Sequence, residues 1–142
     1  MNDDLQSMWN EINAEHFGGE LNPVAEIDWA PISGEDGLDA FGAYFPYSNC
    51  IVIDERFKFD ADMIRAGDEK ETARLEVAFR LVLHEMIHQS LYQKMAPKPG
   101  GHSQSFVEEA TRIAEKLDIQ PPTEKDAFCW PDLLTILASY SI

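Results

Sequence analysis

The sequence LVLHEMIHQSL, residues 81–91, lies in the longest helical pattern of the chain. Apolar residues occur on nearly every side of this segment, which predicts a helix buried at the centre of the fold. Residues four apart on a helix differ by about 40° of rotation, so His84 and His88 project from one face and Glu85 borders them. Zinc hydrolases hold a metal ion and activate water with two neutral imidazoles and a nearby carboxylate. The stretch therefore predicts a metal site on a buried helix.

A catalytic zinc site normally has three protein ligands, so the motif needs one more. The candidates are His102, Glu108 and Glu109, all of which follow a loop rich in proline and glycine. We favour His102, because the two glycines before it let the chain fold back toward the metal helix. Ser103 or Ser105 then caps the next helix, and Glu108 completes a possible capping box with Ser105.

Hydrophobic periodicity divides the chain into a first half that contains a sheet and a helical second half. The predicted helices cover residues 3–17, 70–95, 104–117 and 131–140, and the predicted strands cover residues 24–31, 39–47 and 50–57. We therefore predict an α+β fold in which a small antiparallel sheet of about three strands packs against the long HExxH helix and its flanking helices. A single domain spans residues 1–142, with a core at about 5–117 and a helical extension at 118–142.

The chain is strongly acidic, with a formal net charge of −15 over 142 residues. Such a surface repels phosphate backbones and anionic lipids, which argues against DNA or a membrane as partner and favours a basic protein or peptide substrate. Two cysteines are too few for a disulfide-rich secreted scaffold or a four-cysteine zinc ribbon. The N-terminus does not resemble a signal peptide, and no apolar run approaches the roughly 20 residues that span a bilayer. We therefore expect a cytoplasmic protein.

Peptide hydrolysis also requires a group that stabilises the oxyanion of the tetrahedral intermediate. The tyrosines are candidates, and the sequence does not choose among them: Tyr44, Tyr47, Tyr92 and Tyr140. Either of the predicted strand segments FGAYFPY and EIDWAP is a candidate edge for pairing with an extended peptide.

Three further polar residues receive provisional roles. Histidine ligands usually bond to a carboxylate or a carbonyl group, and Asp54 and Glu109 are candidates for such a partner. His16 lies at the end of the first predicted helix, where a cation interacts favourably with the helix dipole. We interpret His16 as a structural residue.

The run HEMIHQSLYQKMAPKPGGHSQSF, residues 84–106, resembles the SprT-like zinc metallopeptidases, which include the Spartan proteases. That family has HExxH, then a loop that ends in Gly-His, then a Phe that opens the next helix. The matching residues here are His84, Glu85, His88, Gly101, His102 and Phe106. WNEINAEHFGGEL and FGAYFPYSNCIVID are similar to the opening helix and the strand pair of the family, so the likeness covers residues from about 5 to 117.

The resemblance implies a zincin-like catalytic domain that hydrolyses peptide bonds. It implies one zinc ion bound by His84, His88 and His102, with Glu85 as general base. Many members carry a C-terminal zinc ribbon or long regulatory tails, whereas this chain has only DAFCWPDLLTILASYSI there. Spartan-type members carry a basic DNA-binding surface, whereas this chain is acidic, so we expect the peptidase chemistry without the dependence on DNA.

Two other interpretations fit the HExxH motif. One is a non-catalytic interaction module stabilised by zinc, in which Glu85 would have no use. The other is an antirepressor-type HExxH peptidase that regulates a transcription factor, whose third ligand is often an acid and would be Glu108 or Glu109. The C-terminal helix likewise has two interpretations, as part of the core or as a lid over the cleft.

Overall fold

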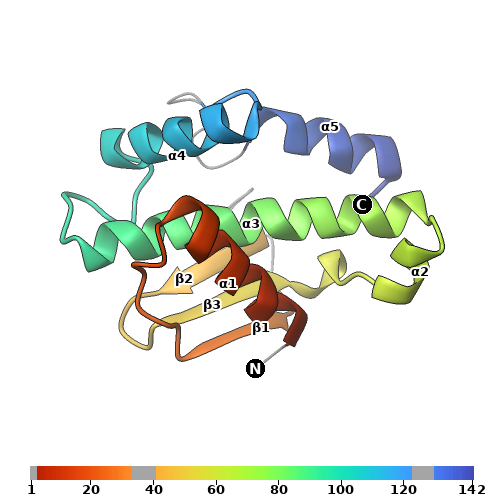
Figure 1. The fold of residues 1–142 in the computed structure, drawn as a ribbon, viewed down its shortest axis with the longest axis horizontal. Helices are drawn as coiled ribbons and strands as arrows, with labels where there is room; N and C mark the ends of the chain where they lie inside the picture. Colours follow the sequence, from red (N-terminus) through yellow and green to blue (C-terminus); the bar gives the residue numbers. More distant parts are fainter. Residues whose placement is uncertain (1–2, 33–40, 123–129) are drawn as a thin grey trace.

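The computed structural model describes residues 3–32, 41–122 and 130–142, and it has the α+β architecture that the sequence predicts (Figure 1). The helices are α1 (Asp3–His16), α2 (Ala61–Arg65), α3 (Glu69–Gln93), α4 (Gln104–Leu117) and α5 (Pro131–Tyr140). The strands are β1 (Glu26–Ala30), β2 (Gly42–Phe45) and β3 (Cys50–Asp54), and the 3-10 helix η2 (Glu55–Phe57) follows β3. Each of the four predicted helices is present with bounds close to those expected.

The sheet is mixed, and the predicted antiparallel topology is wrong. Its strand order is β1–β3–β2, with β2 antiparallel to β3 and β1 parallel to β3. The short turn PYSN permits only a hairpin between β2 and β3, as predicted. The connection from β1 to β3 runs through residues 31–49, which is long enough for the crossover that a parallel pair requires. The alternation of apolar and polar residues in a strand does not distinguish parallel from antiparallel pairing. The parallel pairing of β1 with β3 was therefore not predictable from that alternation.

One face of the sheet is apolar and packs toward α3. Ile27, Ile51 and Ile53 on this face are fully buried, and Ile27 pairs directly with Ile51. Glu26, on the opposite face, is exposed. This alternation is typical of a strand with one face in the core.

The strands are shorter than predicted. The strand expected over residues 50–57 ends at Asp54, because the Asp54 carboxylate accepts a hydrogen bond from the Arg56 N–H and turns the chain into η2. α2 was not predicted; Asp60 caps it by accepting from two backbone N–H groups. Residues 39 and 40 of the predicted second strand lie outside the described part of the chain.

α3 is the central element of the fold. Figure 1 shows the sheet on one side of α3 and both α4 and α5 along the other, while α1 contacts α3 and β1. Every residue from Arg80 to Leu91 is buried, which confirms the central helix predicted from its apolar circumference. Within the described ranges, no helix combines the length and the apolar character needed to cross a membrane.

The loop after α3 positions the start of α4. Met95, two residues after the end of α3, has a left-handed conformation with φ of 57°. α4 begins after Ser103, whose hydroxyl accepts a hydrogen bond from the Phe106 N–H, so Ser103 is the cap and Ser105 is not. Glu108 accepts a hydrogen bond from a neighbouring side chain on the surface of α4 instead of completing the capping box.

The C-terminal helix belongs to the core. The Trp130 indole donates a hydrogen bond to the Arg80 carbonyl oxygen, and the Arg80 guanidinium binds both carboxylate oxygens of Asp132 at 2.8 Å. Trp130 and Leu133 are buried in the same apolar cluster as α1, α3 and α4. α5 thus packs on α3 as a structural element, which favours the core interpretation of this segment over the lid.

Candidate metal centre

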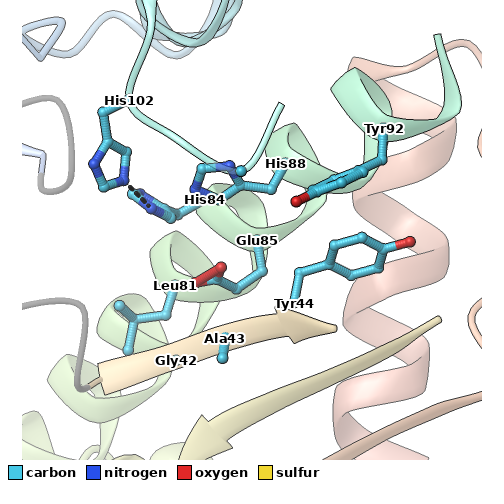
Figure 2. Close-up of a pocket in the computed structure, with 10 residues that line it drawn as sticks. Gly42, Ala43, Tyr44, Leu81, His84, Glu85, His88, Tyr92 and His102 are labelled. Carbon is cyan, nitrogen blue, oxygen red and sulfur yellow. Dashed lines mark hydrogen bonds between the residues drawn. The ribbon is translucent and has the colours of Figure 1, made fainter. Parts of the chain in front are cut away.

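Three of the four histidines converge at the middle of the fold (Figure 2). His84 and His88 project from one face of α3, and His102 approaches from the loop before α4. One ring nitrogen from each residue lies within 4.8 Å of the other two, so the three imidazoles are close enough to bind a single metal ion. The structure therefore brings together the three residues that the sequence predicts as ligands.

The rings are oriented so that lone pairs point into a shared space. His88 Nδ1 lies 2.9 Å from the Pro99 carbonyl oxygen, which only accepts hydrogen bonds, so Nδ1 carries a proton, and in the neutral ring Nε2 keeps the lone pair. His84 Nε2 and His102 Nε2 lie 3.1 Å apart. Two ring nitrogens this close to each other cannot both carry a proton, so at least one more lone pair faces the centre of the cluster.

Phe106 forms an apolar floor under the cluster. Its ring centroid lies 4.8 Å from that of His84, 4.7 Å from that of His88 and 5.0 Å from that of His102. Burial, reinforced by the neighbouring His88 and His102, holds the pKa of His84 well below its usual value of about 6.5. The His84 ring is therefore uncharged at neutral pH, which is the form that binds a metal.

A hollow of about 230 Å³ adjoins the three imidazoles. Its lining comes from β2, α3 and the loop before α4: Gly42, Ala43, Tyr44, Leu81, His84, Glu85, His88, Tyr92, Gly100 and His102. Glu85 is buried here, and Gly42 leaves space for it, because a Cβ at Gly42 would lie 3.3 Å from Glu85 Oε2 and 3.2 Å from Ile53 Cδ1. The carboxylate and the imidazoles therefore border one space, as the motif predicts.

Two of the four candidate tyrosines line the hollow. Tyr47 is fully exposed, and Tyr140 lines a different hollow between α3 and α5. Tyr44 and Tyr92 face each other with ring centroids 5.8 Å apart. Burial raises the pKa of Tyr44, and its protonated hydroxyl donates a 3.0 Å hydrogen bond to Asn49 Oδ1.

The acidic residues considered for the site interact elsewhere. Glu108 is exposed, and Glu109 forms an ion pair with Arg112, so neither alternative third ligand joins the cluster. Asp54 was a candidate partner for a histidine ligand, but its carboxylate pairs with Arg56. A backbone carbonyl, rather than either predicted carboxylate, bonds to the ring of His88.

The fourth histidine, His16, is buried at the end of α1 and is not part of the cluster. Within the described residues, neither ring nitrogen has a hydrogen-bond partner. Burial lowers the pKa of His16, Lys116 and Arg112 act in the same direction, and Glu15 opposes them. The ring is therefore uncharged at neutral pH, so the predicted cation at the helix end is wrong, although a structural role still fits.

Comparison of the chain with protein-family models, curated proteins and solved structures found no match. The likeness to SprT-like peptidases therefore rests on the residues quoted above and stays a prediction. The chemistry of the site must be inferred from its own geometry.

Three parts of the site were not assigned from the sequence. The Pro99 carbonyl has no sequence signal, because every residue carries one. Gly42 had a signal, since a glycine inside a strand often marks close approach of another group. Phe106 belonged to the run that resembles the peptidase family, but its contact with all three imidazoles appears only in the structure.

Proposed function

We propose that the protein is a zinc-dependent peptidase that hydrolyses peptide bonds in protein or peptide substrates. The observation that carries this proposal is the convergence of three imidazoles and the Glu85 carboxylate on one hollow. A metal site that only stabilises a fold is closed by its ligands and needs neither a base nor space for substrate. Both features favour catalysis over the non-catalytic module.

The donor set fits zinc. Zinc binds imidazole nitrogen at about 2.0–2.1 Å with tetrahedral geometry, which separates two ligand nitrogens by about 3.3 Å. His84 Nε2 and His102 Nε2 are 3.1 Å apart, close to that value. The Pro99 carbonyl leaves His88 Nε2 available as the third donor, and such a partner also fixes the ring orientation. Three protein ligands beside an open hollow match the pattern of catalytic rather than structural zinc.

The residues of the hollow divide the chemistry among them. When bound, zinc lowers the pKa of its water ligand toward about 7 and polarises the scissile carbonyl. Glu85 takes a proton from water as the water oxygen attacks the carbonyl carbon, and it then delivers that proton to the leaving amine. Gly42 permits the close approach that keeps this carboxylate beside the reacting atoms.

β2 offers an edge along which a peptide substrate binds. It is an edge strand of the sheet, and Gly42, Ala43 and Tyr44 from it line the hollow. An extended peptide that pairs with this edge lies with its backbone beside Glu85. β1 lies at the other edge and does not contribute to the lining described here, so FGAYFPY is the better of the two predicted segments. The net charge of −15 favours basic peptides and disfavours DNA.

The test compares three variants with the wild-type protein for zinc content and for cleavage of a denatured protein mixture. We expect Glu85→Gln to retain zinc and to lose activity by about 10²–10⁴-fold, since general acid–base catalysis contributes that much. We expect His102→Ala to lose zinc. Glu108→Gln, which makes the same chemical change as Glu85→Gln on the surface of α4, is the matched control and should retain both properties.

Two results would contradict the proposal. Full cleavage by zinc-loaded Glu85→Gln would exclude Glu85 as the base. Normal zinc content in His102→Ala together with zinc loss in Glu108→Gln would restore the acidic third ligand of the antirepressor-type peptidase.

A further inference from the structure

Tyr92 lies on the same face of α3 as the metal-binding histidines. It follows His88 by about one turn and lines the hollow together with His84 and Glu85. Figure 2 shows its hydroxyl pointing toward His88 and the interior of the hollow. The side chain is only partly buried, and it contributes to the lining of the hollow.

Tyr44 faces Tyr92 but directs its hydroxyl elsewhere. In Figure 2 the Tyr44 hydroxyl points away from the three histidines. That hydroxyl donates to Asn49 Oδ1 at 3.0 Å, on the turn between β2 and β3. A phenol has only one proton to donate, so Tyr44 is already committed, and the two tyrosines are chemically alike but differently placed.

The loop that carries His102 lies close against the Tyr92 hydroxyl. A Cβ at Gly100 would lie 2.6 Å from the Tyr92 hydroxyl oxygen, a distance at which a side chain and the hydroxyl could not both stay in place. Gly100 also follows Pro99, whose carbonyl bonds to His88. The absence of a side chain at Gly100 therefore lets the hydroxyl occupy a position beside the ligands.

We infer that the Tyr92 hydroxyl donates a hydrogen bond to the oxyanion of the tetrahedral intermediate; this inference rests on the proposed peptidase function. As water attacks, the new carbon–oxygen bond forms, the water proton goes to Glu85, and the carbonyl electron pair moves onto the oxygen that Tyr92 bonds. When the intermediate collapses, the carbon–nitrogen bond breaks and the proton on Glu85 goes to the amine. Tyr92 keeps its own proton throughout. A donor placed where charge develops stabilises the transition state more than the ground state.

The test uses Tyr92→Phe, with Tyr140→Phe from the separate hollow between α3 and α5 as the matched control, both as zinc-loaded proteins. We expect kcat/KM to fall about 10²-fold in Tyr92→Phe, the loss typical for one oxyanion donor, with unchanged zinc content. Affinity for a phosphinic peptide, whose tetrahedral anion imitates the intermediate, should fall at least about tenfold, whereas affinity for an intact peptide, measured in a Glu85→Gln background, should not change. Tyr140→Phe should keep both affinities, because its side chain lines the other hollow.

The outcomes separate this inference from the proposed function. If Tyr92→Phe cleaves peptides at the wild-type rate and binds the phosphinic peptide with undiminished affinity, the inference is overturned. The proposed peptidase function would remain intact. Equal losses of phosphinic and intact peptide affinity also overturn it, because they show that Tyr92 only shapes the hollow. A wild-type protein that binds zinc but neither cleaves peptides nor binds the phosphinic peptide overturns both.

Discussion

At the end of α1, His16 is buried by itself, whereas in the middle of α3 His84 and His88 are buried together with His102 beside them. Burial lowers the pKa of both His16 and His84, so low exposure and a shifted pKa do not separate a structural histidine from a candidate ligand. The difference lies in what surrounds the rings. Within the described residues, the His16 nitrogens have no hydrogen-bond partner, whereas the α3 histidines have one another, a backbone carbonyl and a hollow that contains a carboxylate.

The largest expected effect is the stabilisation of the fold by zinc. A metal that binds only the folded cluster raises the free energy of unfolding by about 2.7 kcal/mol when free zinc is at 100 times its Kd. We expect His102→Ala to abolish this gain and His16→Leu to retain it, because only the first removes a member of the cluster. Urea unfolding with zinc and with a chelator measures the gain in each protein.

Two results would contradict this distinction between His16 and the histidine cluster. A zinc-dependent gain that persisted in His102→Ala would mean that another group completes the site. Loss of the gain in His16→Leu would mean that the end of α1 contributes to metal binding, which its position outside the cluster does not predict.

The second prediction concerns the space that glycine provides beside the cluster. A Cβ at Gly100 would lie 2.6 Å from the Tyr92 hydroxyl oxygen but 3.5 Å from Tyr92 Cζ. We expect Gly100→Ala to lower the free energy of unfolding by about 1 kcal/mol, at the low end of overpacking costs, because the atom in the way is the end of a partly exposed side chain that can move aside. Tyr92→Phe removes the atom in the closest contact, so the cost of Gly100→Ala should be smaller in the double variant, with a coupling energy on the order of 1 kcal/mol.

Gly101 supplies the matched control for this cycle. A Cβ at Gly101 would have the Lys98 carbonyl oxygen as its nearest neighbour at 3.8 Å, which is an ordinary van der Waals contact. Gly101→Ala should therefore change the unfolding free energy by no more than about 0.5 kcal/mol. Equal costs at the two glycines, measured by urea unfolding in chelator, would show that loop flexibility matters here rather than the space beside Tyr92.

The comparison also shows why part of the site was predictable from the sequence. His84, Glu85 and His88 lie on one helix, so the helical repeat alone fixes their relative directions. His102 was predicted because a glycine pair allows the chain to return to the helix, and the structure places it beside His84. Local helix geometry and chain connectivity were therefore sufficient to predict that these two helix histidines, Glu85 and His102 lie together.

Features that depend on tertiary packing were not predictable in the same way. β1 pairs parallel to β3 because a long connection allows it, and strand patterning carries no information on direction. The environment of His16 depends on elements far along the chain, since Lys116 and Arg112 of α4 influence its pKa. Sequence position at a helix end favoured a cation there, but burial and the nearby Lys116 and Arg112 lower the pKa of His16.

The smallest expected effect concerns this isolated histidine. Because burial lowers the pKa of His16 in the folded protein, the unfolded chain, with an ordinary pKa of about 6.5, binds a proton more readily. Well above pH 6.5 neither state is protonated there, so His16 adds no pH dependence. As the pH falls below about 6.5, the unfolded state gains the proton first and the free energy of unfolding decreases, by at most about 1.4 kcal/mol per pH unit for one group.

His16→Leu should therefore flatten the decline in stability between about pH 6.5 and pH 5 relative to the wild type. Urea unfolding in chelator at several pH values measures both slopes, and their difference isolates His16 because the His84 contribution is common to both proteins. At higher pH, removal of a buried ring whose nitrogens lack partners among the described residues should leave stability unchanged or slightly increased. A wild-type slope no steeper than that of His16→Leu would mean that folding leaves the pKa of His16 unchanged or raises it. A raised pKa would restore the cation at the helix end as the correct interpretation of His16.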